Sequence, residues 1–180
     1  MALSNPYRGE RRPGTVGHPL PGVEVRIVEG ELWVRGPALF KEYWRNPDAT
    51  RESFRESFFC TGDVAEIRDG YYCIRGRSSV DIIKSAGYKI SALEIEQVLA
   101  EHPSVRDVAV VGVPDAEWGE VVTACVVPKP GASLSMDDVR EFCGDKLAPY
   151  KTPRRLEVMS ELPRNAMGKV TKPDLVRRLA

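Results

Sequence analysis

The feature that most constrains the fold of this chain is a change of pattern near residues 76–81. Before that point, short runs rich in β-branched and aromatic residues dominate. Two pairs of these runs are joined by the dipeptides Glu29-Gly30 and Asp69-Gly70, and turns of this length and composition are typical of β-hairpins. We therefore predict hairpins over residues 23–35 and 63–75, with a short helix over residues 47–54 between them.

After residue 81, helical and strand patterns alternate. Strands are expected over residues 105–113, 120–127 and 155–159, and helices are expected to begin at Ser91, Ser135 and Thr171. Each helix start has an acidic residue three positions later, which matches a capping box or a near variant, and a pair of apolar residues placed as a hydrophobic staple. Residues 82–180 are therefore predicted to form an α+β domain of a common size.

The composition argues against several classes of function. With 26 basic and 26 acidic residues the net charge is zero, so neither a nucleic-acid surface nor an anionic-membrane surface is expected. No apolar stretch approaches the ~20 residues that span a bilayer. No signal peptide follows Met1, and the start resembles a cut through a longer chain. The four cysteines are widely spaced: Cys60, Cys73, Cys125 and Cys143. We expect them to be buried thiols in a reducing compartment, and not zinc ligands or disulfides.

The segment over residues 163–169 ends in Gly168-Lys169, directly before a predicted helix. A P-loop is excluded because that motif needs glycine where Pro163 stands and Ser or Thr where Val170 stands. What remains is a lysine on a loop that contains Pro, Asn and Gly. Such a lysine is usually solvated surface, so its meaning depends on the other motifs of the chain.

Two further segments give that context: Thr61-Gly62-Asp63, and the stretch from Gly76-Arg77 to residue 94. Taken singly, a turn aspartate and a surface arginine would explain them. In this order and together with residues 163–169, they resemble three hallmark motifs of the adenylate-forming superfamily of acyl-CoA synthetases, luciferases and peptide-synthetase adenylation domains. Residues 4–17, 79–84 and 87–94 are similar to the malonyl-CoA synthetase group, and this likeness covers essentially all 180 residues.

The resemblance implies a domain organisation and a reaction. Residues 1–77 would be the β-rich C-terminal part of a large N-terminal domain, residues 78–81 a hinge, and residues 82–180 a C-terminal α+β lid with a small sheet and flanking helices. The parent enzyme would be an AMP-forming acid–CoA ligase that acts on malonate or methylmalonate. ATP and a carboxylic acid would form an acyl-adenylate, and CoA would then displace AMP. Mg²⁺ would accompany the nucleotide without a protein ligand in this chain.

The resemblance also implies residue roles. Asp63 would bind the ribose hydroxyls as a bidentate acceptor, and Arg77 would contact the ribose or a phosphate. Lys169 would be the catalytic residue: it would bridge the acid's carboxylate and the α-phosphate, and offset the charge that grows there during adenylation.

After the lid rotates, the face that bears Gly87, Tyr88 and Lys89 would line the path of the pantetheine arm. Gly87 would allow close approach of the ligand. Lys89 would meet a CoA phosphate, although surface charge explains that lysine equally well. The stretch from Arg77 to Gly87 is one residue longer than in many members, so the hinge residue could be any of the three at positions Ser79, Val80 and Asp81.

A dicarboxylate substrate needs a cation that a fatty-acid pocket would exclude. Arg11 and Arg12 are the two candidates, and nothing in the sequence chooses between them. The simpler explanation of both is a solvated basic loop that also contains Arg8.

The phosphate loop of the superfamily, rich in Ser, Thr and Gly, is absent from these residues, as is the region that builds most of the acid pocket. We therefore expect no complete ligase activity from this chain alone, and a partner in the N-terminal region of the same enzyme. The cytoplasm is the expected location, with the mitochondrial matrix left open. The alternative is a standalone binding or regulatory module derived from such a ligase, without catalysis. A third hypothesis is a structural protein of ordinary α+β type, in which case the three motifs would have arisen by chance.

Overall fold

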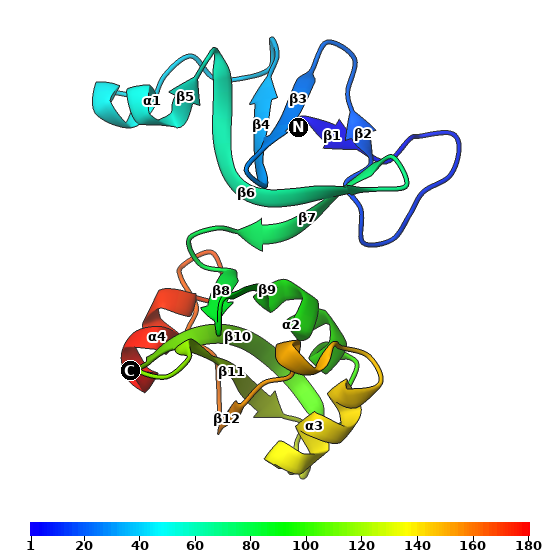
Figure 1. Ribbon diagram of the computed structural model, residues 1–180, viewed down its shortest axis with the longest axis vertical. Helices are drawn as coiled ribbons and strands as arrows, with labels where there is room; N and C mark the ends of the chain where they lie inside the picture. Colours follow the sequence, from blue (N-terminus) through cyan, green and yellow to red (C-terminus); the bar gives the residue numbers. More distant parts are fainter. The chain divides into compact units, whose positions relative to one another are not determined.

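The chain folds into two units, Met1–Ser78 and Ser79–Ala180, and the computed structural model describes all 180 residues (Figure 1). The mixed α+β class expected from the sequence is confirmed. The boundary between the units lies within residues 76–81, where the sequence pattern changes.

Five strands form the main sheet of the first unit, in the order β3–β4–β6–β5 with β7 on β6. Their bounds are Glu24–Val28 for β3, Glu31–Arg35 for β4, Phe54–Arg55 for β5, Phe58–Arg68 for β6 and Tyr71–Arg77 for β7. A two-stranded ribbon pairs β1 (Leu3–Ser4) with β2 (His18–Pro19), and α1 spans Pro47–Ser53.

Both predicted hairpins of this unit are present, as β3–β4 and β6–β7. Their turn residues have positive φ, 52° and 90° at Glu29 and Gly30, and 46° and 82° at Asp69 and Gly70. Two consecutive positive φ angles are characteristic of the type I′ turn, whose twist matches that of the flanking strands. A small buried cluster, with partly buried neighbours, consists of Leu32, Val34 and Ala65. Phe58 and Cys73 of the same sheet are also buried.

The second unit has a five-stranded sheet in which β11 is central. Strand β10 pairs antiparallel along one side of β11, while β8 and the parallel β12 pair with its other side, and β9 pairs with β8. The bounds are Ile82–Ser85 for β8, Tyr88–Ser91 for β9, Val105–Asp115 for β10, Gly119–Pro128 for β11 and Arg155–Val158 for β12. The helices are α2 (Ala92–Ala100), α3 (Met136–Gly144) and α4 (Lys172–Leu179), with a 3₁₀ turn at Pro149–Lys151.

Helices cover both faces of this sheet because both faces of β10 and β11 are apolar. Alternate residues of a strand point to opposite faces. One set packs with α2 and α3, and includes Val110, Val122, Ala124 and Val126. The intervening set packs with Leu175 of α4, and consists of Ala109, Val111, Val113, Cys125 and Val127.

The three predicted helix caps differ in the structure. Ser135 forms a complete capping box with Asp138, and the Ser91 hydroxyl accepts a bond from the Glu94 N–H at 3.2 Å. The prediction for Thr171 is wrong, because its side chain makes no capping bond to α4. The Thr171 hydroxyl instead donates to the carbonyl of Pro163, 3.2 Å away. The hydroxyl is therefore used to close the preceding loop.

Candidate functional site

Asp63 and Arg77 lie opposite each other in the register of β6 and β7. Arg77 Nε is 3.0 Å from Asp63 Oδ1, and the side chains are 62% and 28% exposed. The two residues that the sequence placed 14 positions apart thus form one polar site at the end of the hairpin. An ion pair that is open to solvent can exchange bonds with a ligand at little cost, because exposed pairs are weak.

The backbone that carries Asp63 is fixed by neighbouring polar groups. The Thr61 hydroxyl donates to the Leu32 carbonyl at 2.7 Å and accepts from the Asp63 N–H at 3.0 Å. Glu31 accepts from the Gly62 N–H at 2.8 Å. These bonds join the Thr61-Gly62-Asp63 segment of β6 to strand β4, so the backbone that carries the Asp63 carboxylate has a defined position.

Lys169 lies on a closed loop over residues 163–171, which we call the Lys169 loop. Asn165 organises it: its side-chain oxygen accepts from the N–H groups of Met167 and Lys169, both at 3.0 Å. The Asn165 N–H also donates to the Lys169 carbonyl at 2.9 Å. Gly168 has φ of 77°, a conformation in which a side chain is strained.

The base of the Lys169 loop is tied to β10. Arg164 pairs with Asp107 and donates to the Gly168 carbonyl at 2.7 Å. The Lys169 side chain itself is exposed and makes no hydrogen bond or ion pair. The structure therefore presents a single unpaired ammonium on a loop whose backbone is held by its own polar groups.

Gly87, Tyr88 and Lys89 lie at the tip of a hairpin formed by β8 and β9, which was not predicted. Its turn has φ of 49° at Ala86 and 81° at Gly87, again the type I′ conformation. The positive φ at position 87 explains why the residue there is glycine. Apart from Gly87 itself and its two chain neighbours, no residue has an atom within 4 Å of where a Gly87 Cβ would be, so the space above it is open.

The β8–β9 hairpin also brings two lysines together. Lys84 is directly opposite Lys89 in the register, and both are exposed. Like charges in this position repel each other and destabilise the hairpin. The same two charges favour binding of an anion. Lys84 was not predicted as a site residue. Two lysines placed symmetrically about Ala86-Gly87 are the signal that would have found it.

Tyr88 stacks on Tyr150, with ring centroids 4.4 Å apart and an interplanar angle of 18°. The two residues remain 51% and 41% exposed. Tyr150 belongs to the 3₁₀ turn, so this contact joins the hairpin tip to a segment far along the chain and gives it a flat aromatic surface.

The three hinge candidates differ in burial. Ser79 and Val80 are exposed, whereas Asp81 is only 8% exposed. Asp81 pairs with Lys172 inside the second unit.

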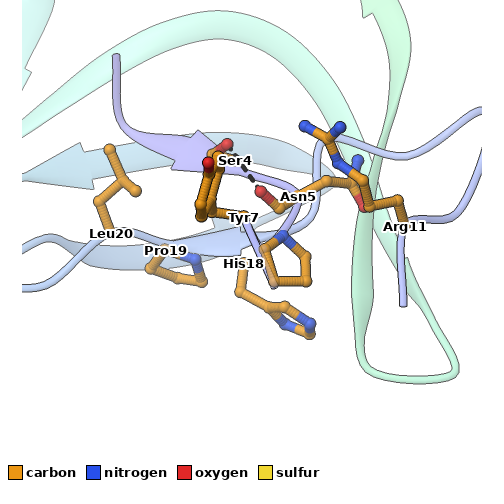
Figure 2. Close-up of a pocket in the computed structure, with 8 residues that line it drawn as sticks. Ser4, Asn5, Tyr7, Arg11, His18, Pro19 and Leu20 are labelled. Atoms are coloured by element: carbon orange, nitrogen blue, oxygen red, sulfur yellow. Dashed lines mark hydrogen bonds between the residues drawn. The ribbon is translucent and has the colours of Figure 1, made fainter. Parts of the chain in front are cut away.

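Arg11 and Arg12 have different surroundings. Arg12 pairs with Glu10 at 2.8 Å and lies over the Tyr71 ring at 4.5 Å, and its hydrogen bond to Glu10 raises the pKa of the guanidinium. Figure 2 shows Arg11 among the side chains that line an open cavity of about 360 Å³, together with His18. Arg12 is thus committed to partners in its own unit, while Arg11 faces space that a ligand can enter.

The structure joins Asp63 to Arg77 in the first unit, and places the Lys169 loop and the β8–β9 hairpin as two separate loops of the second. No group of three or more His, Cys, Asp or Glu side chains is close enough to hold a metal ion. No helix is both long and apolar enough to cross a membrane.

Residues 94–169 match the family model described as the AMP-binding enzyme C-terminal domain, and the match ends at Lys169. Among curated proteins, the chain is 50% identical to a mitochondrial malonate–CoA ligase, ACSF3, of Bos taurus, over 99% of this chain and 36% of the relative. It is also 50% identical to a malonate–CoA ligase of Arabidopsis thaliana, over 99% of this chain and 33% of the relative. The chain thus spans about a third of the length of the curated relatives it matches.

The chain is also similar to solved structures of adenylate-forming enzymes. ATP-bound MatB from Rhodopseudomonas palustris matches with a TM-score of 0.87 and 39% identity, over 99% of this chain and 38% of that one. The o-succinylbenzoate CoA synthetase MenE from Bacillus subtilis, in complex with its acyl-adenylate intermediate, matches with a TM-score of 0.84 and 33% identity, over 90% and 35% of the two chains.

Proposed function

Because the chain belongs to the adenylate-forming acyl-CoA synthetase superfamily, we propose that it is the C-terminal part of an AMP-forming acid–CoA ligase. The acid is malonate or methylmalonate. The observation that carries this proposal is the Lys169 loop, where the family match ends on an exposed lysine without a counter-ion. Residues Met1–Ser78 supply the end of the large N-terminal domain, and Ser79–Ala180 is the lid.

In the first half-reaction, a carboxylate oxygen of the acid bonds to the α-phosphorus of ATP while the bond to pyrophosphate breaks. Asp63 accepts from the ribose hydroxyls, and Arg77 beside it contacts the ribose or a phosphate. The Lys169 ammonium lies between the two reacting anions and offsets their repulsion as charge develops. Mg²⁺ accompanies the phosphates and is not held by this chain.

In the second half-reaction, the CoA thiol loses its proton and attacks the acyl carbon, and AMP leaves. We assign the β8–β9 hairpin to this step. The open space over Gly87 admits the pantetheine arm, the Tyr88 ring flanks it, and Lys89 attracts a phosphate of CoA. Lys84, opposite Lys89, adds a second positive charge for the same phosphate.

The lid movement between the two steps needs a hinge. Ser79 or Val80 fits this role better than Asp81, because Asp81 is buried and paired inside the unit that moves. A residue that changes its backbone angles must not be held by such contacts.

Malonate is proposed because the bovine and Arabidopsis relatives are named malonate–CoA ligases. Arg11 is the better candidate for the second carboxylate, since it faces the cavity and Arg12 is already paired. The four free cysteines fit a reducing compartment. We propose the cytoplasm or the mitochondrial matrix, the latter because the bovine relative is named mitochondrial.

Acid-dependent pyrophosphate exchange by the full-length ligase tests the proposal, with malonate, methylmalonate, acetate and a medium-chain fatty acid as substrates. The expected order places the two dicarboxylates first, and Arg11→Met should remove that preference while Arg12→Met keeps it. A preference for the monocarboxylic acids contradicts the malonate assignment. No exchange with any acid contradicts the ligase assignment, as does a reading frame that lacks the phosphate loop.

A further inference from the structure

A buried cluster of three charged side chains lies where the Lys169 loop joins helix α4. Lys172 Nζ is 2.8 Å from Glu96 Oε1 and also binds Asp81 Oδ1. The side chains of Lys172, Asp81 and Glu96 are only 11%, 12% and 17% exposed. We call these three residues the ion cluster. By comparison, the side chains of the Lys151–Glu94 pair in the same unit are 19% and 27% exposed.

The ion cluster connects four elements of the second unit. Asp81 directly precedes β8, and its carbonyl accepts from the N–H of Ala92, the first residue of α2, at 2.8 Å. Glu96 lies on α2 and also accepts from the Val110 N–H of β10 at 2.7 Å. Lys172 is the first residue of α4. One ammonium thus links the start of the lid to the helix that follows the Lys169 loop.

Stability alone is a weak reason for this arrangement. Burial raises the pKa of Glu96, and the charge of Lys172 opposes that rise. Replacing buried ion groups by apolar side chains of similar size is often neutral or stabilising. Helix α4 is in any case anchored by fully buried Leu175. The charges instead contribute specificity of position, because the ion pairs of Lys172 fix where the first turn of α4 lies.

The position of that turn is one of the two anchors that place Lys169, and the Arg164–Asp107 pair is the other. Thr171 closes the base of the Lys169 loop: both its N–H, at 2.9 Å, and its hydroxyl, at 3.2 Å, donate to the Pro163 carbonyl. Lys172 follows immediately. Since the Lys169 side chain makes no hydrogen bond or ion pair of its own, its ammonium is placed by this base, by the loop's internal bonds and by the Arg164–Asp107 pair.

We propose that Lys172 is a positioning residue. Through Asp81 and Glu96 it fixes the base of the Lys169 loop to the strand that leaves the hinge segment, so that lid movement carries Lys169 as part of a rigid body. This inference rests on the proposed role of Lys169 in adenylation. Lys172 itself touches no reacting atom.

The experiment uses the full-length ligase with Lys172→Met, Lys172→Arg and the control Lys146→Met, which removes an ion pair with Glu101 on another face of the unit. Hydrogen exchange of peptides over residues 163–171 is measured first. Lys172→Met should speed exchange there on the order of tenfold, by local opening of the loop base. Lys172→Arg should restore protection, and Lys146→Met should leave it unchanged. Unchanged exchange in Lys172→Met overturns the proposal whatever the activity is.

Kinetics supply the second readout. Lys172→Met should lower kcat for acid-dependent adenylation roughly 10- to 100-fold, as expected for a displaced catalytic group, with little change in KM for ATP. Conversion of preformed acyl-adenylate by CoA should be nearly unaffected. Equal loss in both half-reactions contradicts a positioning role. If Lys169→Ala leaves adenylation intact, the proposed function of Lys169 fails, while the exchange result still decides whether Lys172 holds the loop.

If Lys172→Met does not fold, Glu96→Gln takes its place. The amide oxygen can still accept from Val110 and Lys172, so the backbone contact is kept while one charge is removed. The same faster exchange and the same selective loss of adenylation are expected, at smaller size. Wild-type exchange and rates in Glu96→Gln contradict the proposal.

Discussion

Arg77 faces Asp63 across strands β6 and β7, with Nε 3.0 Å from Oδ1. The two groups proposed to bind the nucleotide are therefore oriented by each other before any ligand is present. Thr61 and Glu31 hold the turn that carries Asp63. A ribose that bonds to Asp63 enters a site whose geometry is already set, so less ordering is required on binding.

The first prediction concerns Asp63. Asp63→Ala should raise KM for ATP in the full-length ligase roughly 10- to 100-fold, because a bond to a charged acceptor is worth ~1.5–3 kcal/mol. Steady-state adenylation rates over a range of ATP concentrations measure this effect. Glu66→Gln is the matched control, since Glu66 lies on the same strand and pairs with Arg75 and Arg68 instead. An unchanged KM in Asp63→Ala would remove Asp63 from the nucleotide site.

The second prediction concerns Lys84 and Lys89. Replacing either by Ala should raise KM for CoA, and the effect should shrink at high salt because exposed charges are screened. Adenylation should be unaffected. Since the two like charges face each other, either replacement should also stabilise the fold slightly, by roughly 0.2–1 kcal/mol.

Lys129→Ala is the control for this pair, because Lys129 is exposed in the same unit and away from the hairpin. Thermal unfolding and CoA titration of the same samples separate the two effects. Stabilisation without a change in KM for CoA would mean that the lysines are only surface charge.

The third prediction concerns Cys125, which is fully buried in β11. Burial, and to a lesser extent Glu157, raises the pKa of its thiol from 9.0 to about 11. The thiolate fraction at about pH 8 is then about 100-fold lower than in the unfolded chain, so alkylation by iodoacetamide should be slower by at least that factor. Cys60, which is partly exposed, should be modified first.

The same thiol contributes to the pH dependence of stability. A folded pKa above the unfolded one means that the neutral thiol stabilises the fold at low pH. This contribution is full below pH 9.0 and is lost as pH rises towards about 11. Mass spectrometry of the alkylated peptides and denaturant titrations over this range check both statements. Rapid labelling of Cys125 in the native protein would contradict its burial.

Local sequence signals predicted much of the fold. The Glu29-Gly30 and Asp69-Gly70 turns were identified because each is a two-residue linker between β-type runs, and both have positive φ in the structure. The β8–β9 hairpin was missed because Gly87 was interpreted only as part of a ligand-facing surface. Thr171 was interpreted as a cap from its spacing to Asp174, but spacing does not reveal that Pro163 offers a competing acceptor.

The candidate site was predictable only in part. Asp63, Arg77 and Lys169 were proposed from the order of the motifs, and their roles stay predictions. Lys172 could not be found, because its partner Asp81 is 91 positions away and the contact exists only once β8, α2 and α4 have packed together. Lys84 could be recognised only after the hairpin register was known. Tertiary packing, rather than residue type, buries Lys172 and places Lys84 opposite Lys89.

The most direct test of the central claim is Lys169→Ala in the full-length ligase, with each half-reaction measured separately. Met167→Ala is the control, since Met167 is 76% exposed on the same loop. Pyrophosphate exchange with malonate should fall roughly 10²–10³-fold in Lys169→Ala, the usual cost of losing one transition-state donor. Conversion of preformed malonyl-adenylate by CoA should fall far less. An equal fall in both half-reactions, or no fall in either, would contradict the role of Lys169.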